Sequence, residues 1–230
     1  PPRSTPKPSS AASDVYKRQE YVLFRKGPMT MGASQLCGFA KSDSSRETPN
    51  LQFHVQPIST DKLGGSNLHN FNAFTPTVAN IRPTSRGEVY INSSDSRDNP
   101  KIKMNYLSTQ EDRKVTAAGL KLIRKIVLGT KAFTKYEPEE FRPGKDIQDD
   151  EELVKAASDY AQTIFHPVGT CKMGNDEYSV VNERLVARGL ENLRIVDASI
   201  MPNITSGNTN APTMMIAEKA ADMIIEDTKT

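Results

Sequence analysis

Hydrophobic and polar residues follow a short period in the first half of the chain. Residues 51–55, with the sequence LQFHV, alternate with a period of two, which predicts a strand with one buried face. Residues 74–81 and 87–91 are further strand candidates, and the sequence RPTSRG at residues 82–87 forms a turn between them. Residues 92–100 have the Ser, Asp, Asn and Pro content of a loop.

The period lengthens beyond Thr109, where apolar residues recur about every three to four positions, as in amphipathic helices. One helix is predicted from a cap at Thr109 to a stop at Gly129. A second should begin near residues 149–150, with acids in its first turn, and run through Tyr160. A third is predicted to begin at Pro212. Strands first and helices later favour an α+β fold, with an antiparallel sheet backed by helices.

The N-terminal segment differs in composition from the rest of the chain. Residues 1–19 are rich in Pro, Ser and basic side chains, and they show no apolar periodicity. They lack the apolar core of about 7–15 residues that a secretory signal requires, although their basic character is compatible with a transit peptide. Residues 11–19 resemble translated cloning or adaptor sequence. We therefore expect a disordered, non-native tail, with native coding from Glu20.

Charge and composition exclude several classes of protein. The 30 basic and 28 acidic residues leave a formal net charge of +2, without a block of like charge. We expect neither a nucleic-acid partner nor a polybasic membrane patch. No apolar run approaches the about 20 residues of a membrane span, so no transmembrane segment is expected. Two cysteines and three scattered histidines suggest no metal site. A cytoplasmic location is the default, with peripheral membrane association or an organelle as alternatives.

Three polar loops punctuated by glycine carry the candidate chemistry. His166 opens the first, HPVGTCKMG, and a neutral imidazole can take a proton near neutral pH. Asp197 follows a predicted apolar strand at residues 193–196, either as a turn residue or as a carboxylate at the mouth of a sheet. The third loop, SGNTNAPT at residues 206–213, precedes a helix whose N-terminus would favour an electron-rich group such as reduced flavin. Each residue also has a purely structural explanation, as a core histidine, a turn or a cap.

These loops occur in the order found in the C-terminal portion of the glucose–methanol–choline (GMC) oxidoreductase family, which the chain resembles. The RPTSRG turn resembles the start of that family's C-terminal domain. The resemblance covers residues 20–227, and residues 51–91 are most similar to choline dehydrogenases and related bacterial alcohol dehydrogenases. It implies that residues 20–81 are the start of the substrate-binding region. Residues 82–222 would then be the C-terminal domain of the family, and residues 223–230 its C-terminal end.

The family resemblance implies FAD-dependent oxidation of an alcohol to an aldehyde or ketone. It implies that His166 takes the hydroxyl proton while a hydride passes from the substrate carbon to the flavin. Asn208 matches the position that hydrogen-bonds the substrate oxygen, and Asn210 takes this place if the match slips by two residues. The implied flavin contacts are Asp197, Ala198, Thr209, Asn210, Ala211 and Pro212.

None of the 13 glycines stand at the spacing of the nucleotide-binding fingerprint G-x-G-x-x-G. We therefore expect a C-terminal fragment that is inactive alone. Such a fragment should leave sheet edges and apolar surface uncovered. The electron acceptor is a quinone or another carrier, or oxygen if the parent protein is an oxidase. A non-catalytic binding module is the alternative from another class. The alcohol stays open. A choline pocket would need an aromatic cage or a carboxylate for the quaternary ammonium, and aromatic residues in strands, such as the candidates Phe71, Phe74 and Tyr90, are more often core residues.

Overall fold

The structure is a computed structural model, and it describes residues 10–30, 32, 34, 36–61 and 68–229. The chain forms two compact units. The first comprises the residues up to 38 together with residues 53–77, and the second comprises residues 39–52 together with those from 78 onward. All the residues of the candidate site belong to the second unit.

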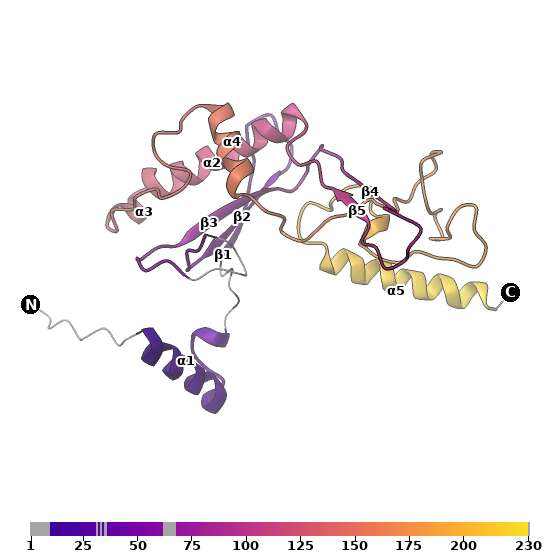
Figure 1. Cartoon of the computed structure of the whole chain (residues 1–230), viewed down its shortest axis with the longest axis horizontal. Coiled ribbons are helices and arrows are strands. Elements are labelled where there is room, and N and C mark those ends of the chain that lie inside the picture. Colours follow the sequence, from indigo (N-terminus) through magenta and orange to yellow (C-terminus); the bar gives the residue numbers. More distant parts are fainter. Residues whose placement is uncertain (1–9, 31, 33, 35, 62–67, 230) are drawn as a thin grey trace, which may run out of the picture. The chain divides into compact units, whose positions relative to one another are not determined.

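Two small sheets form the β part of the fold (Figure 1). Strands β1 (Leu36–Ala40), β2 (Leu51–Gln56) and β3 (Thr75–Asn80) lie in one sheet in the order β1-β2-β3. Strands β4 (Glu88–Tyr90) and β5 (Lys101–Lys103) pair antiparallel, with Val89 opposite Ile102. The architecture is α+β, with small antiparallel sheets backed by helices, as the sequence predicted. Strands β1 and β5 were not predicted, because neither carries a clear apolar alternation.

Strand β2 forms where it was predicted, but its burial does not alternate. Leu51 and Gln52 are both buried, with exposed fractions of 1% and 2%, and the remaining residues of the strand are intermediate. Leu51 lies against helix α2 (Gln110–Gly129), while the Gln52 side chain bonds to Asn208. Both faces of the strand are therefore covered at its beginning, and the expected single buried face is wrong there.

The helices after Thr109 confirm the predicted periodicity. The Thr109 side chain caps α2 by accepting from the Asp112 amide, and α2 ends at Gly129. Helix α3 (Lys131–Thr134) follows. Helix α4 (Asp150–Tyr160) is capped by Asp149 and packs against α2 (Figure 1).

Helix α5 (Asn210–Asp227) begins two residues before the predicted start at Pro212. The difference is small in physical terms, because proline is tolerated anywhere in a first turn, where the amides have no partner within the helix.

The N-terminal segment is helical where the structure describes it, and the expected disordered, non-native tail at residues 1–19 stays a prediction. Residues 10–19 form the first part of α1 (Ser10–Phe24), which the short 3-10 helix η1 (Pro28–Thr30) follows. The segment contains the good helix formers Ala, Lys, Arg and Gln and no proline, so nothing interrupts a helix. Residues 1–9 of the predicted tail lie outside the described residues.

Gly119 lets α2 approach the sheet closely. A Cβ atom at this position would lie 3.0 Å from Val78 Cγ2 and 3.4 Å from Leu51 Cδ2. Leu51, Val115 and Ala117 are each exposed by only 1%, so the contact between α2 and the sheet is dry and tightly packed. This packing holds the beginning of β2, and with it the backbone of Gln52, in place.

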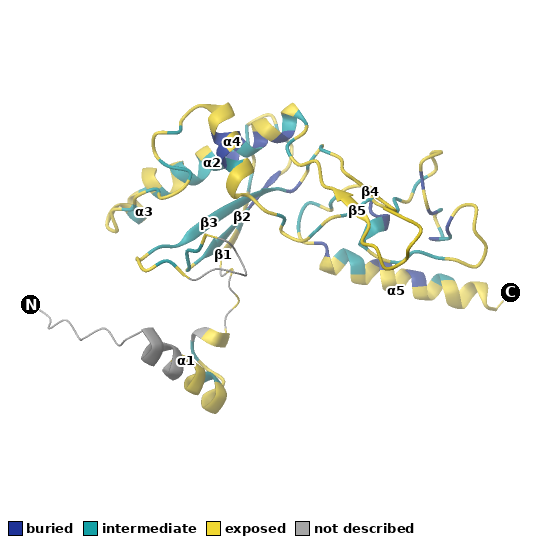
Figure 2. Cartoon of the chain, in the orientation of Figure 1, coloured by how far each residue is buried: buried dark blue, intermediate teal, exposed yellow. Residues whose placement is uncertain are grey.

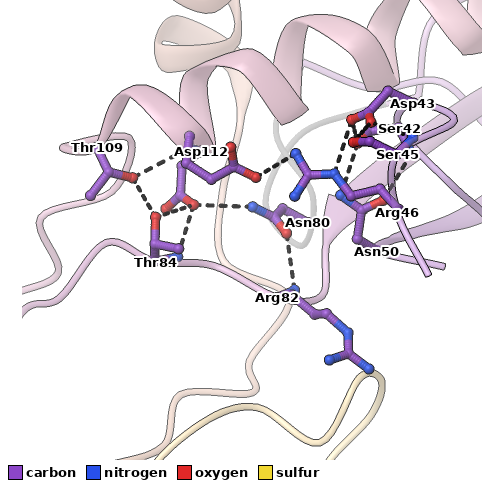
Figure 3. A network of polar contacts seen from close by, with 11 residues as sticks. Ser42, Asp43, Ser45, Arg46, Asn50, Asn80, Arg82, Thr84, Thr109 and Asp112 are labelled. Carbon is purple, nitrogen blue, oxygen red and sulfur yellow. Dashed lines mark hydrogen bonds and ion pairs between the residues drawn. The ribbon is translucent and has the colours of Figure 1, made fainter. Parts of the chain in front are cut away.

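A buried carboxylate joins the RPTSRG turn to α2 (Figure 3). Asp112 accepts hydrogen bonds from the Thr84 amide at 2.8 Å and from Asn80 Nδ2 at 3.2 Å, and Figure 3 labels these residues. It also accepts from the Ser85 amide at 2.9 Å. Burial alone would raise the pKa of Asp112, but the hydrogen bonds from Ser85 and Thr84 outweigh it, and the pKa lies below its usual value. The charged form of Asp112 therefore stabilises the fold. A separate cluster, in which Asp43 binds Ser42, Ser45 and Arg46, lies nearby in Figure 3.

The C-terminal region has its own core but little regular structure before α5. Its buried apolar residues are Val181, Leu185, Ile200, Met201, Ile216 and Ala220. Residues 193–196 are not a strand as predicted, and contribute only an isolated bridge between Val186 and Arg194. Their backbone groups pair with an adjacent loop, as when the Ile195 amide donates to the Leu185 carbonyl at 3.1 Å, so no ladder develops.

Large apolar side chains remain exposed, as expected from the sequence. Figure 2 shows exposed residues over much of α5 and of the β4-β5 pair. They include Met214, Met215, Ile224 and Ile225 on α5, and Val89, Tyr90 and Ile102 on the two strands.

Among the described helices, none combines the length and the apolar character that crossing a bilayer requires.

Candidate functional site

The loop that begins at His166 is anchored by its backbone. The Cys171 amide donates to the Ser199 carbonyl at 3.0 Å, and the Met173 amide donates to the Ile200 carbonyl at 2.8 Å. Gly169 has a φ of +89°, and a Cβ atom there would lie 3.4 Å from the Met201 carbonyl oxygen. The loop therefore lies flat on the turn at residues 199–201, which fixes the position from which His166 emerges.

The imidazole of His166 lies between two residues of the third polar loop. Its Nε2 is 2.7 Å from Asn208 Nδ2, and its Nδ1 is 2.9 Å from Thr209 Oγ1. The Thr209 amide also donates to Nδ1, at 3.4 Å. The structure thus brings together three residues that the sequence analysis singled out. Asn208, rather than Asn210, is the asparagine that contacts the histidine.

Gln52 joins this group from strand β2 and was not predicted. Its Nε2 donates to Asn208 Oδ1 at 3.0 Å, across 156 positions of sequence. No signal in the sequence indicated this contact, because the alternating pattern of the strand indicated only a solvent-facing position for Gln52. The four residues Gln52, Asn208, His166 and Thr209 form a continuous chain of hydrogen bonds, called the amide–imidazole chain below.

Thr209 occupies the N-cap position of α5, but its side chain does not cap the helix. Its side chain makes no hydrogen bond to the first turn and instead meets His166. Asn210 and Ala211 are exposed, and Pro212 has no amide hydrogen. The first turn of α5 therefore presents backbone N–H groups and the positive end of the helix dipole without a side-chain acceptor from its own N-cap.

Asp197 and Ala198 belong to the short 3-10 helix η2 (Ala198–Ile200). The Asp197 carboxylate accepts from the Ser199 amide at 2.7 Å, so it caps this turn. Ala198 packs on the C-terminal core. The structure therefore supports the turn explanation for Asp197, while its carboxylate stays exposed beside the capped amide.

The other two histidines have partners outside the amide–imidazole chain. His54 Nδ1 is 3.2 Å from Ser34 Oγ, and His69 contacts Ser59 and Asp61. Within the described ranges, no three His, Cys, Asp or Glu side chains gather in a way that could hold a metal ion.

Comparison with known proteins gives this site a family context. The family profile described as GMC oxidoreductase matches residues 83–217, which is more than half of the chain. The chain is 44% identical over 205 residues to the alcohol dehydrogenase [acceptor] of Pseudomonas putida, covering 89% of this chain and 37% of that protein. It is 45% identical over 187 residues to the oxygen-dependent choline dehydrogenase of Proteus mirabilis, covering 81% of this chain and 33% of that protein. The chain thus spans about a third of the length of the curated relatives it matches.

A solved structure gives the same picture of the fold. The Aspergillus oryzae formate oxidase, whose description concerns FAD modification, matches with a TM-score of 0.82 at 23% identity. The match covers 94% of this chain and 42% of that one. The resemblance found in the three polar loops is therefore confirmed by an independent family match and by the fold. The chain belongs to the GMC oxidoreductase family.

Proposed function

We propose that this chain supplies the proton-accepting and substrate-orienting groups of an FAD-dependent alcohol dehydrogenase that acts on CH–OH donors. The observation that carries the proposal is the 2.7 Å contact between His166 Nε2 and Asn208 Nδ2. The half-buried ring of His166 thus offers a nitrogen lone pair, and the exposed side chain of Asn208 offers an amide N–H beside it. Relatives named as alcohol and choline dehydrogenases support the reaction class.

An alcohol oxygen needs both of these groups when its carbon is oxidised. His166 Nε2 would take the hydroxyl proton, and Asn208 would donate a hydrogen bond to the oxygen as its negative charge develops. In the absence of substrate the two groups satisfy each other. Entry of the hydroxyl would replace one mutual hydrogen bond by two bonds to the substrate.

The residues at the start of α5 fit an FAD ring edge. The side chain of Thr209 is directed to His166, so the first-turn amides stay open to an electron-rich group. Thr209, Asn210, Ala211 and Pro212 would hold the ring edge through this first turn. Bound FAD would supply the acceptor for the hydride that leaves the substrate carbon.

We extend the proposal to Asp197 and Ala198 as further flavin contacts by family resemblance, with one Asp197 oxygen already engaged by Ser199. The proposal also keeps residues 82–222 as the C-terminal domain of the family and residues 20–81 as the start of its substrate-binding region. The partners would be a small alcohol and an electron acceptor. The Pseudomonas putida relative is named for an unspecified acceptor, which we propose to be a carrier such as a quinone. Oxygen is the alternative, favoured by the name of the Proteus mirabilis relative.

The experiment that tests the proposal compares the full-length protein carrying these residues with the 230-residue chain alone. The full-length protein should purify with the absorption of oxidised flavin, and alcohols should bleach it without oxygen. The colour should then return with a quinone analogue or with oxygen, which distinguishes dehydrogenase from oxidase. The 230-residue chain should be colourless. A full-length protein that neither retains nor takes up FAD would contradict the proposal and favour a binding module.

A further inference from the structure

We propose that Gln52 is a positioning residue that sets the proton position on His166 by fixing the orientation of the Asn208 amide. The effect on the imidazole follows from this structure alone. Its consequence for turnover rests on the proposed function, in which His166 Nε2 takes the substrate proton.

The argument begins with the two different ends of the Asn208 amide. Gln52 Nε2 donates to Asn208 Oδ1 at 3.0 Å, so the opposite end, Nδ2, faces His166 Nε2 at 2.7 Å. An amide NH₂ group can only donate, so Nε2 must accept and cannot carry a proton. The proton of the neutral imidazole then lies on Nδ1, where it points to Thr209 Oγ1 at 2.9 Å. This contact is shorter than that with the Thr209 amide, which is directed at the same Nδ1 from 3.4 Å and favours the opposite tautomer. The direction of the first hydrogen bond fixes the direction of all three.

The reversed chain of hydrogen bonds shows what Gln52 prevents. If the Asn208 amide turned over, its Oδ1 would face Nε2, and Nε2 would have to carry the proton. Nδ1 would then accept from Thr209, whose amide lies 3.4 Å away. An imidazole in this state has no lone pair at Nε2 and cannot take a proton there. The structure assigns the productive direction, in which Gln52 is the donor.

Gln52 is suited to this task by its position. Its exposed fraction is 2%, and the adjoining Leu51 is packed against α2 with an exposed fraction of 1%. Turning Nε2 away from Asn208 would leave a buried N–H group without this hydrogen bond, which is unfavourable. Asn208, by contrast, is exposed on a loop. A buried residue of the sheet therefore holds an exposed loop residue of the site by a hydrogen bond, although the two lie 156 positions apart.

The test reads the imidazole directly by ¹⁵N NMR of the histidine-labelled chain at about pH 8, where imidazoles are mainly neutral. The chain has three histidines, and loss of signals in His166→Ala assigns those of His166. We expect the Nδ1–H tautomer in the unmodified chain. Gln52→Glu replaces the donor by a group that only accepts, so Asn208 should turn its NH₂ toward the new carboxylate. His166 should then change to the Nε2–H tautomer.

Two further variants separate this effect from a loss of structure. Gln56→Glu places the same charge on the same strand, away from the amide–imidazole chain, and should leave the His166 tautomer unchanged. Gln52→Met has a similar length without a polar group, and should give a mixture of both tautomers. If Gln52→Glu does not fold, Gln52→Met decides the matter. An Nε2–H tautomer in the unmodified chain, or the same tautomer in folded Gln52 variants, would overturn the inference.

Turnover in the full-length protein gives the second readout. Gln52→Glu should lower kcat by about tenfold or more, up to the about 10²–10⁴ that a general base contributes, with little change in flavin content. A full-length protein without alcohol oxidation would contradict the proposed function and leave the tautomer result standing. A normal kcat together with an unchanged tautomer in Gln52→Glu would contradict only the role of Gln52.

Discussion

The α2–α4 region and the loops from His166 to Thr209 are held together in different ways. Helices α2 and α4 carry side-chain caps from the residues just before them, and α2 packs on the sheet through Gly119. The loop region depends on polar contacts between distant residues, 42 positions apart for His166 and Asn208 and 156 apart for Gln52 and Asn208. The first arrangement provides stability, while the second places chemical groups. A substitution should therefore affect mainly one of the two properties, depending on its region.

The sharpest way to test this separation is His166→Ala in the full-length protein. The substitution removes the proposed base, so turnover should fall by about 10²–10⁴. The half-buried ring lies on the loop rather than in the core, so the thermal midpoint should change little. Steady-state alcohol oxidation and thermal unfolding, measured on the same preparation, check both parts. Near-normal turnover would refute the assignment of His166.

The opposite result is expected for Gly119→Leu in α2. The new side chain would enter the space occupied by Val78 and Leu51, which should destabilise the fold by about 1–3 kcal/mol. Gly129→Leu is the matched control, because nothing lies within 4 Å of a Cβ atom at that position in the same helix. Denaturant unfolding of the two variants measures the difference. Equal stability of both variants would show that the contact between α2 and the sheet is not tightly packed.

Asp112 makes the stability of the α2–α4 region depend on pH. Because its folded pKa is lowered, its contribution is present above the unfolded pKa of about 3.9 and is lost as the pH falls through the folded pKa. Asp112→Asn removes this titration. The variant should be less stable than the parent chain at about pH 6, and the difference should shrink below about pH 4. Unfolding curves at several pH values measure it, and a difference independent of pH would contradict the role of the charge.

The smallest effect is expected for Arg184→Ala, near the C-terminal end of α5. Arg184 pairs with Glu226 at 3.2 Å and with Asp227 at 2.6 Å, and these carboxylates are exposed. Exposed ion pairs contribute little and are screened by salt. Thermal midpoints should differ slightly at low ionic strength and converge at high ionic strength. A large loss that persists in salt would show that the bond from Arg184 to the Met223 carbonyl, at 3.0 Å, is the important one.

The sequence predicted what depends on neighbours along the chain. Thr109 and Asp149 were expected near helix starts because a cap acts within one turn, and both side chains do accept first-turn amides. The α+β class followed from the order of the strand and helix patterns. The strand predicted at residues 193–196 failed, because its backbone bonds to residues 185–187 form one isolated bridge and do not extend into a ladder.

The candidate site was predicted in part for the same reason. His166, Asn208 and Thr209 were found because each stands in a loop with a distinctive local composition, and the structure brings them into contact. Gln52 was missed because nothing near it in sequence points to a residue 156 positions away. The contact is created by the packing of β2, so it requires tertiary structure to be seen.

Because the start of α5 has no side-chain cap, ligand binding there would change the order of its first turn. A helix end without a side-chain acceptor should fray, and its amides should exchange their hydrogens with solvent quickly. A bound group that accepts hydrogen bonds from those amides would replace the missing cap, and its binding free energy would stabilise the first turn. The beginning of α5 would then act as a reporter, whose hydrogen exchange slows as the site fills.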